Sequence, residues 1–215
     1  ITYSICENLN PNNCQTATAT VVVGASEIIA GADDFSNTPV NGKTGGIVGD
    51  VTANDTLNGD PVEDADVYIV NNGGLSGAAI NANGNLVVPP NTPAGTYTVS
   101  YSICEVLNPN NCATTTVTVV VAASELVATN DDFSATPVKG ADGGVAGNVL
   151  GNDTLDNAAV DFADVAVTLS DNGGLSGVAI NDNGDLIVPP NTPAGTYTIT
   201  YSICENLNPN NCQTA

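Results

Sequence analysis

The stretch that decides the fold is Gly95–Val121, which reads GTYTVSYSICEVLNPNNCATTTVTVVV. It contains two runs of alternating residues separated by a loop rich in Asn and Pro. The apolar members of the two runs are Tyr97, Val99, Tyr101 and Ile103, then Val117, Val119 and Val121. A period of two predicts β-strands with one apolar and one polar face. The loop between them predicts a hairpin.

The two cysteines of this stretch set the register of the predicted hairpin. If Cys104 lies opposite Cys112, then Ser102 faces Thr114 and Ser100 faces Thr116 on the polar side. On the core side, this register places Tyr97, Val99 and Tyr101 opposite Val119, Val117 and Thr115. Register, polarity and cysteine positions agree, so we expect a disulfide on the polar face of the hairpin.

All six cysteines occur in three copies of the phrase YSICExLNPNNC, and the spacing of the two cysteines is the same in each copy. The expected pairs are Cys6 with Cys14, Cys104 with Cys112, and Cys204 with Cys212. Zinc is the alternative for paired cysteines, but it favours four ligands with shorter Cys spacing, and the chain has no histidine to complete a set. Disulfides point to an oxidising compartment, either secreted or on a cell surface.

The phrase belongs to a repeat of about one hundred residues. From Asn72–Cys112 to Asn172–Cys212, 34 of 41 residues match. We expect a C-terminal hairpin of a preceding repeat at 1–23, one complete repeat at 24–121, and a repeat at 122–215 without its last strand. Residues 1–17 and 199–215 are identical, which favours a window of a longer chain. Strand exchange between subunits is the alternative reading of these ends.

Each repeat is predicted to be all-β. The expected strands of the first repeat are 27–35, 46–53, 65–71, 77–81, 84–88, 95–104 and 114–121, separated by turns rich in Gly, Asn and Pro. Seven strands in about one hundred residues predict a Greek-key, immunoglobulin-like β-sandwich. A β-solenoid would repeat every ~20–30 residues. Tyr97 and Tyr197 are candidates for the corner tyrosine of such sandwiches or for ordinary core aromatics.

Composition narrows the function. The chain has 23 acidic residues, two lysines and no histidine, and its formal net charge is −21. Such a surface repels nucleic acid and anionic membranes, and no apolar run is long enough to span a bilayer. The residues that a histidine triad or a phosphoryl clamp needs are missing from the sequence, which excludes these two kinds of catalysis. We therefore expect that the chain is not an enzyme.

Calcium is the only cofactor that the sequence suggests. Acidic and amide side chains follow each junction and recur about twenty residues later: Asp33, Asp34, Asn54 and Asp55, then Asp131, Asp132, Asn152 and Asp153. Calcium takes six to eight oxygen ligands, and these segments could meet at a junction. The set matches no contiguous calcium loop, and Asp and Asn are also the usual residues of turns.

The repeated phrases DDFS, NDTL, PAGTYT and NPNNC, followed by a Thr/Val strand, resemble the tandem Ig-like repeats of giant Bacteroidetes surface proteins. The nearest likeness is to the mobile adhesin of gliding bacteria. The resemblance implies a stalk on the bacterial cell surface, outside the cell, that serves attachment or gliding. Its partners would be neighbouring repeats, with glycans or substratum bound through other parts of the parent.

Two finer expectations accompany this reading. The Asp-Thr-Leu triplets resemble the O-glycosylation acceptor of those bacteria, which implies sugars on Thr56 and Thr154. The same residues also suit an ordinary turn. The alternative function is a carbohydrate-binding array in which the repeats contact ligand directly, through rows of alternating threonines. Threonine also favours strands on a solvated face without any ligand.

Overall fold

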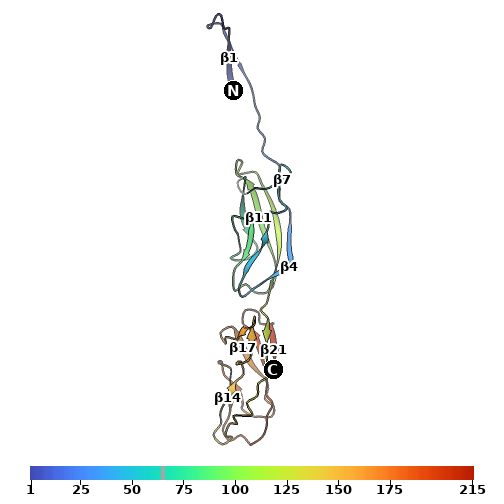
Figure 1. Ribbon diagram of the computed structural model, residues 1–215, viewed down its shortest axis with the longest axis vertical. Helices are drawn as coiled ribbons and strands as arrows, with labels where there is room; N and C mark the ends of the chain where they lie inside the picture. The colour runs from blue at the N-terminus through green and yellow to red at the C-terminus, as the bar shows by residue number, and fades with distance from the viewer. Residues whose placement is uncertain (64–65) are drawn as a thin grey trace.

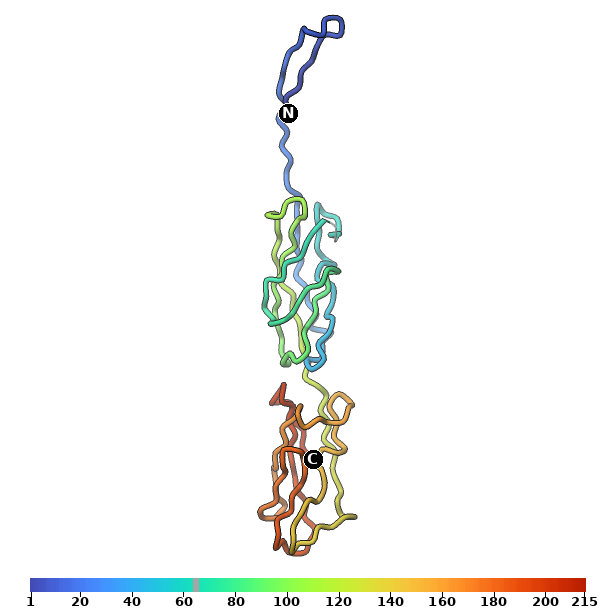
Figure 2. The backbone as a smooth tube through the Cα atoms, turned by 90° about the vertical axis from the view of Figure 1, so that its left-hand side faces the viewer, coloured from blue at the N-terminus to red at the C-terminus, as the bar shows by residue number. Residues whose placement is uncertain are grey.

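The computed structural model describes residues 1–63 and 66–215 and is elongated (Figure 1). A hairpin of β1 (Thr2–Cys6) and β2 (Cys14–Thr18) stands at one end. Two bodies follow it along the long axis, each with its own hydrophobic core. We name them the first domain (residues 26–122) and the second domain (residues 124–215). Figure 2 shows an extended segment between the hairpin and the first domain, and one short connection between the first domain and the second.

The described residues contain strands, turns and bends but no helix, so the fold is all-β as the alternation predicts. In the first domain a four-stranded sheet has the order β4-β12-β11-β8, and two three-stranded sheets have the orders β5-β10-β9 and β3-β6-β7. Its strands are β3 (Ile28–Ile29), β4 (Asp33–Asn41), β5 (Gly46–Asp50), β6 (Thr56–Leu57), β7 (Asp60–Pro61), β8 (Val67–Gly73), β9 (Ala79–Ile80), β10 (Asn85–Val88), β11 (Gly95–Glu105) and β12 (Cys112–Ala122).

The β11–β12 hairpin has the register expected from the cysteines. Cys104 pairs with Cys112, Ser102 with Thr114, and Tyr101 with Thr115. Its inward side chains, together with residues of β10, form a core that is closed to solvent. The most buried members are Leu86, Val99, Tyr101, Ile103, Val117 and Val119, all 0% exposed. Burial of alternating side chains on facing sheets is what fixes this register.

One strand pairing was not anticipated. β4 runs parallel to β12, with Val117 opposite Asp33 and Val119 opposite Phe35, and a register shift follows before Val121 meets Val40. The predicted strand 27–35 is therefore wrong as a single element, since the chain bends between β3 and β4. The short strands β6 and β7 were missed. The predicted strand 65–71 begins at a residue outside the described part of the chain, and its remainder corresponds to β8.

The polar face of β11 is less solvated than expected. Ser102 is 9% exposed and Cys104 only 3%. The reason is that β11 is a central strand, flanked by β12 on one side and β8 on the other. Asn72 adds a side-chain hydrogen bond to the Ser102 hydroxyl at 2.8 Å. The outer half of the hairpin, on β12, is solvated as expected.

The second domain repeats this plan in part. Its strands are β13 (Leu126–Val127), β14 (Gly144–Asn148), β15 (Thr154–Leu155), β16 (Ala158–Ala159), β17 (Val165–Asp171), β18 (Ala179–Ile180), β19 (Asp185–Val188), β20 (Thr200–Glu205) and β21 (Cys212–Thr214). Its hairpin sheet has the order β17-β20-β21. In the described residues, no strand corresponds to β4, and β21 is much shorter than β12.

A corner tyrosine is present in both domains. The Tyr97 hydroxyl donates to the Pro93 carbonyl at 2.8 Å, and Tyr197 donates to Pro193 at 2.9 Å. Each tyrosine is thus tied to the backbone four residues upstream, which is the corner geometry of immunoglobulin-like sandwiches. This bond pins the loop that leads into the hairpin.

Candidate functional site

The disulfide loops and the contact between the domains form the most distinctive polar site of the molecule. Each cysteine pair lies within its own hairpin, as the spacing led us to expect, and each has a Cα–Cα separation of 4.1 Å. The loop of the first domain is closed by backbone bonds from Glu105 to Asn111 and from Asn111 to Asn108. The same bonds recur in the other two loops, so the phrase encodes one rigid turn.

A glutamate at the base of each loop organises its amides. In the isolated hairpin, Glu7 accepts hydrogen bonds from Asn10 and Asn13, both at 3.0 Å, although the whole hairpin is exposed. In the second domain, Glu205 accepts from Asn208 and Asn211, both at 2.9 Å. The cluster therefore forms within the loop itself and needs no neighbouring domain.

In the complete domain this cluster also holds the segment through which the chain enters. Glu105 is 4% exposed, and it accepts the Ser26 hydroxyl at 2.9 Å and the Ser26 backbone N–H at 3.4 Å. Asn111 donates to the Ser26 carbonyl at 2.8 Å. Hydrogen bonds from Asn111 and Asn108 lower the pKa of the Glu105 carboxyl, because they favour its charged form. The disulfide loop thus clamps the start of its own domain.

The junction between the domains joins the far end of the first domain to this loop region of the second. Lys43 forms an ion pair with Asp164 at 2.6 Å, and Asn41 donates to Asp156 at 3.0 Å. The backbone N–H of Ala94 donates to the Asn208 side-chain oxygen of the second disulfide loop at 2.6 Å. Three polar contacts, from the end of β4, the turn that follows it and the loop before β11, fix the angle at which the second domain stands.

Asp156 is the centre of this junction. Partial burial acts to raise its pKa, but hydrogen bonds from the Glu125 backbone and the Asn41 side chain, together with the charge of Lys43, outweigh that and lower it. Asp156 also caps the linker, since it accepts the Glu125 backbone N–H at 2.9 Å. The leucine of the disulfide loop is less exposed where the loop lies at the junction. Leu107, at the end of the first domain away from the junction, is 85% exposed, whereas Leu207 at the junction is half-buried.

The eight residues predicted as calcium ligands lie within the domains and make none of these junction contacts. In the first domain, Asp33 and Asp55 meet at the hydroxyl of Tyr101, at 2.9 Å and 3.4 Å. That hydroxyl also bonds to the Val51 carbonyl. In the second domain, Tyr201 contacts Asp131 at 3.1 Å, Asp153 at 3.3 Å and the Val149 carbonyl at 2.9 Å.

The aspartates of this cluster have raised pKa values. Burial raises the pKa of Asp33 to about 6, with smaller contributions from the charges of Asp55 and Asp50, although the Tyr101 hydroxyl acts against this. Burial also raises the pKa of Asp55, Asp131 and Asp153. One phenolic proton is shared among several acceptors in each domain, so the cluster is short of donors.

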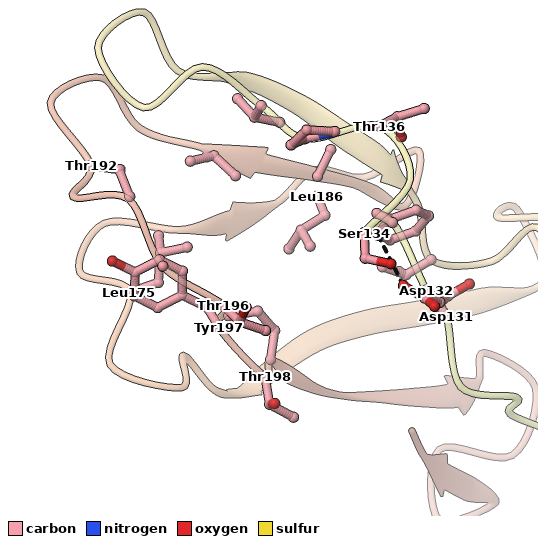
Figure 3. A pocket seen from close by; sticks show the side chains of 18 of the residues that line it. Asp131, Asp132, Ser134, Thr136, Leu175, Leu186, Thr192, Thr196, Tyr197 and Thr198 are labelled. Atoms are coloured by element: carbon pink, nitrogen blue, oxygen red, sulfur yellow. Dashed lines mark hydrogen bonds between the residues drawn. The ribbon is translucent and has the colours of Figure 1, made fainter.

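The other four predicted ligands make hydrogen bonds to backbone groups within their own domain, as Figure 3 shows for Asp132 and Ser134. Asp34 and Asp132 accept the backbone N–H of Ser36 and Ser134, both at 2.9 Å. Asn54 donates to the Ala32 carbonyl and Asn152 to the Asn130 carbonyl. Within the described residues, no group of three or more His, Cys, Asp and Glu side chains is arranged to hold a metal ion. The geometry gives the calcium prediction no support.

The predicted glycosylation sites are only partly accessible. Thr56 and Thr154 are half-buried and belong to the short strands β6 and β15. Asp55 and Asp153, which precede them, are 1% exposed. A sugar on either threonine remains a prediction.

Comparison with known proteins adds little to this description. No protein-family profile matches the chain, and no characterised protein matches its sequence. Among solved structures it is similar to extracellular cadherin domains 3–6 of protocadherin gamma B2 (TM-score 0.35, 11% identity, 88% of this chain and 45% of that one). It is also similar to the human desmocollin-1 ectodomain (0.37, 10%, 83% and 36%) and to Drosophila N-cadherin EC1-4 (0.33, 12%, 89% and 47%).

The chain therefore spans less than half the length of these three structures. At these TM-scores the likeness carries no argument about function, which has to come from the chain's own geometry. No helix of the described residues is long and apolar enough to cross a membrane.

Proposed function

We propose that the chain is a stalk segment of a large secreted adhesin on a bacterial cell surface, of the kind that gliding Bacteroidetes carry. Its work would be mechanical, giving reach and resisting force and proteolysis, while other parts of the parent make the attachment. The disulfides support an extracellular location, since they persist in oxidising surroundings. The strongly acidic composition supports an array that stays soluble.

The observation that carries this proposal is the parallel pairing of β4 with β12. The chain enters the first domain at one end of the long axis and leaves it at the opposite end (Figure 1). Tension along that axis therefore pulls β4 and β12 in opposite directions along their length. The hydrogen bonds of a parallel ladder are evenly spaced, so they are loaded together and must break together. This arrangement resists force better than a ladder that opens one bond at a time.

The junction supports the same function. After β12 ends at Ala122, the chain continues to Ser124, whose carbonyl accepts a hydrogen bond from the Asn211 side chain of the next disulfide loop at 2.8 Å. The connecting residues include no run of glycine, serine or proline, which would make a flexible or PPII-like spacer. Force thus passes from a core strand of one domain to a clamped segment of the next. The hairpin that makes the clamp is closed by a covalent bond.

The proposal is tested on intact cells of the source organism with antibodies raised against this chain. In a stalk, antibody labels recur along surface filaments with an axial repeat of about 40 Å, the length of an eleven-residue strand at ~3.3 Å per residue plus turns. Labels confined to filament tips, or found inside the cell, overturn it. Binding of the isolated chain to a glycan array would move the assignment to direct ligand recognition.

A further inference from the structure

One edge of the first domain is formed by an uncharged strand. β8, whose sequence is VYIVNNG, lies at the end of the sheet β4-β12-β11-β8, and none of the described residues pairs with its outer edge. The strand contains no acidic residue, no lysine and no proline. Edge strands present unpaired N–H and C=O groups, and proteins ordinarily protect them with charge, proline or short length. β8 has none of these three protections.

The other edge strands of this domain are protected. β4 contains Asp33, Asp34 and Pro39. β5 ends in Asp50, and its pairing with β10 contains a register shift. β3, β7 and β9 have only two residues each. β8 is therefore the edge at which this domain can accept another strand.

The backbone of β8 alternates in a way that leaves Ile69 facing outward. The Val106 N–H donates to the Asp66 carbonyl at 2.8 Å, so these two residues extend the β8–β11 ladder by one hydrogen-bonded pair. In an antiparallel ladder such pairs alternate with pairs that are not bonded to each other. Tyr68 and Val70 therefore bond to β11, while Ile69 directs its N–H and C=O groups to the free edge.

The side chains beside this edge are apolar and already held in place. Tyr68 is 40% exposed and Val70 is 39% exposed. The Tyr68 hydroxyl donates to the Pro109 carbonyl of the disulfide loop at 3.0 Å, which holds the ring in one orientation. Ile69, on the inner face, packs against the hydrophobic core. A neighbouring strand would gain apolar contacts on both faces.

We propose that β8 pairs antiparallel with β8 of a second copy of this chain and joins the two molecules through one continuous sheet. The two Ile69 residues then lie opposite each other and exchange their N–H···O=C bonds across a two-fold axis. Tyr68 of each copy lies opposite Val70 of the other, and pairs of an aromatic and a β-branched residue are favourable across strands. The inference does not rest on the proposed function, because it uses one edge within the first domain.

Charge sets the direction of the pairing. Asp66 precedes β8 and Asn72 lies near its end, so an antiparallel partner places each carboxylate opposite an amide. A parallel partner would place the two Asp66 carboxylates side by side, and like charges in that position are destabilising. The antiparallel register is also self-complementary, because one strand supplies both halves of every pair. A second copy therefore fits this edge.

The equivalent edge of the second domain is not suited to the same contact. β17 has Ala166 in place of the tyrosine and Thr168 in place of the outward valine. It also contains Asp171, and a charge within an edge strand is a protection that β8 lacks. The second domain should therefore stay unpaired at this edge, and it supplies a matched control.

The expected dimer is weak. A contact along one short strand buries much less than the about 1,200 Å² at which standard interfaces begin. Each copy also carries a formal net charge of −21, so two copies repel at low ionic strength. In about 0.5 M NaCl the Debye length is below ~8 Å and most of that repulsion is screened. Under these conditions we expect a Kd of about 0.1–1 mM.

The test is sedimentation velocity of the whole 215-residue chain between about 20 and 500 µM in this buffer. We expect a reversible monomer–dimer equilibrium, because an isologous contact closes at two copies. Val70→Asp puts a charge into the pairing and should keep the chain monomeric. Thr168→Asp adds the same charge at the same place in the second domain and should dimerise as the wild type does. Both positions are exposed, so neither variant should unfold its domain.

Hydrogen exchange followed by NMR locates the contact. Between about 20 and 500 µM, exchange of the Ile69 amide should slow about 1.5-fold or more, as the expected Kd requires. Exchange of the Val167 amide, at the same place in β17, should not change. Asp66→Asn tests the direction of pairing. It should alter the Kd by less than about threefold, and a greater gain in affinity would mean that the two strands run parallel.

Two results would overturn the proposal. A wild-type chain that stays monomeric at about 500 µM rules out a second copy as the occupant and leaves the edge to an extended segment of another protein. Association that survives Val70→Asp, or that is lost equally in Thr168→Asp, places the contact elsewhere on the molecule.

Discussion

Replacement of Asp33 by Asn should stabilise the first domain at neutral pH and remove much of its pH dependence. Asp33 has a pKa raised to about 6, mainly by burial, against an ordinary value of 3.8. A carboxyl whose pKa is higher in the folded state stabilises the fold when protonated. That stability is fully present below about pH 3.8 and is lost as the pH rises to about 6. Asn keeps the oxygen that accepts the Tyr101 hydroxyl and carries no charge at any pH.

The expected gain in the free energy of unfolding follows from the pKa shift of Asp33. A difference of about two pKa units corresponds to roughly 3 kcal/mol at most. Asp33 is partly exposed, and solvent screening reduces the effect, so we expect about 1–2 kcal/mol at pH 7. The gain should shrink towards zero between pH 6 and pH 4. Carboxyls with lowered pKa values, such as Asp34, act in the opposite sense but only at lower pH.

The assay is urea unfolding of the whole chain at pH 4.5, 5.5, 6.5 and 7.5, followed by NMR signals of amides in β11. Asp34→Asn is the matched control, because it removes the same charge from an exposed neighbour and should leave the slope between pH 4.5 and 7.5 unchanged. An Asp33→Asn domain that is less stable than the wild type at pH 7.5, or equally pH-dependent, would refute the burial argument.

Three further changes have defined expectations. Tyr101→Phe leaves buried acceptors without their donor and should destabilise the first domain by about 1–3 kcal/mol in the same urea assay; an unchanged midpoint would mean that the hydroxyl is dispensable. Replacing Cys104 and Cys112 by Ala removes a nine-residue loop closure and should cost about 2.6 kcal/mol by chain entropy, and a loss below 0.5 kcal/mol on this scale would show that the loop holds without its bond. Lys43→Ala removes an exposed ion pair, so the free energy of unfolding should change by less than about 1 kcal/mol. Small-angle X-ray scattering should nevertheless show a wider spread of interdomain angles, while Lys139→Ala, at the other end of the second domain, leaves them unchanged.

The register of the hairpin could be predicted because several local constraints act on the same few positions. The alternation of Tyr97–Ile103 fixes which face is buried, and the cysteine pair fixes which residue lies opposite which. A shift of one residue would turn every apolar side chain outward. No comparable constraint acts on β4, whose pairing with β12 joins residues more than eighty positions apart.

The site was less predictable, because its chemistry depends on tertiary contacts. The clamp around Glu105 and the junction pair of Lys43 with Asp164 were missed. A signal for the first was present, since the same glutamate follows the first cysteine in all three copies. The acidic segments were expected to meet at a junction between repeats, but only Asp33 with Asp55 and Asp131 with Asp153 come together. They meet at a buried tyrosine inside each domain. The spacing of turn residues along the sequence does not indicate which buried side chain they will contact.

The most direct test of the stalk account is to stretch single molecules of this chain between its two ends. The first domain, with its parallel β4–β12 ladder, should unfold in one high-force event that lengthens the molecule by roughly 270 Å, at ~3.4 Å per residue outside the disulfide loop. The second domain has no such ladder among its described residues and should open at clearly lower force. Two weak events of equal force in the original chain, or smooth extension without a peak, would contradict the account.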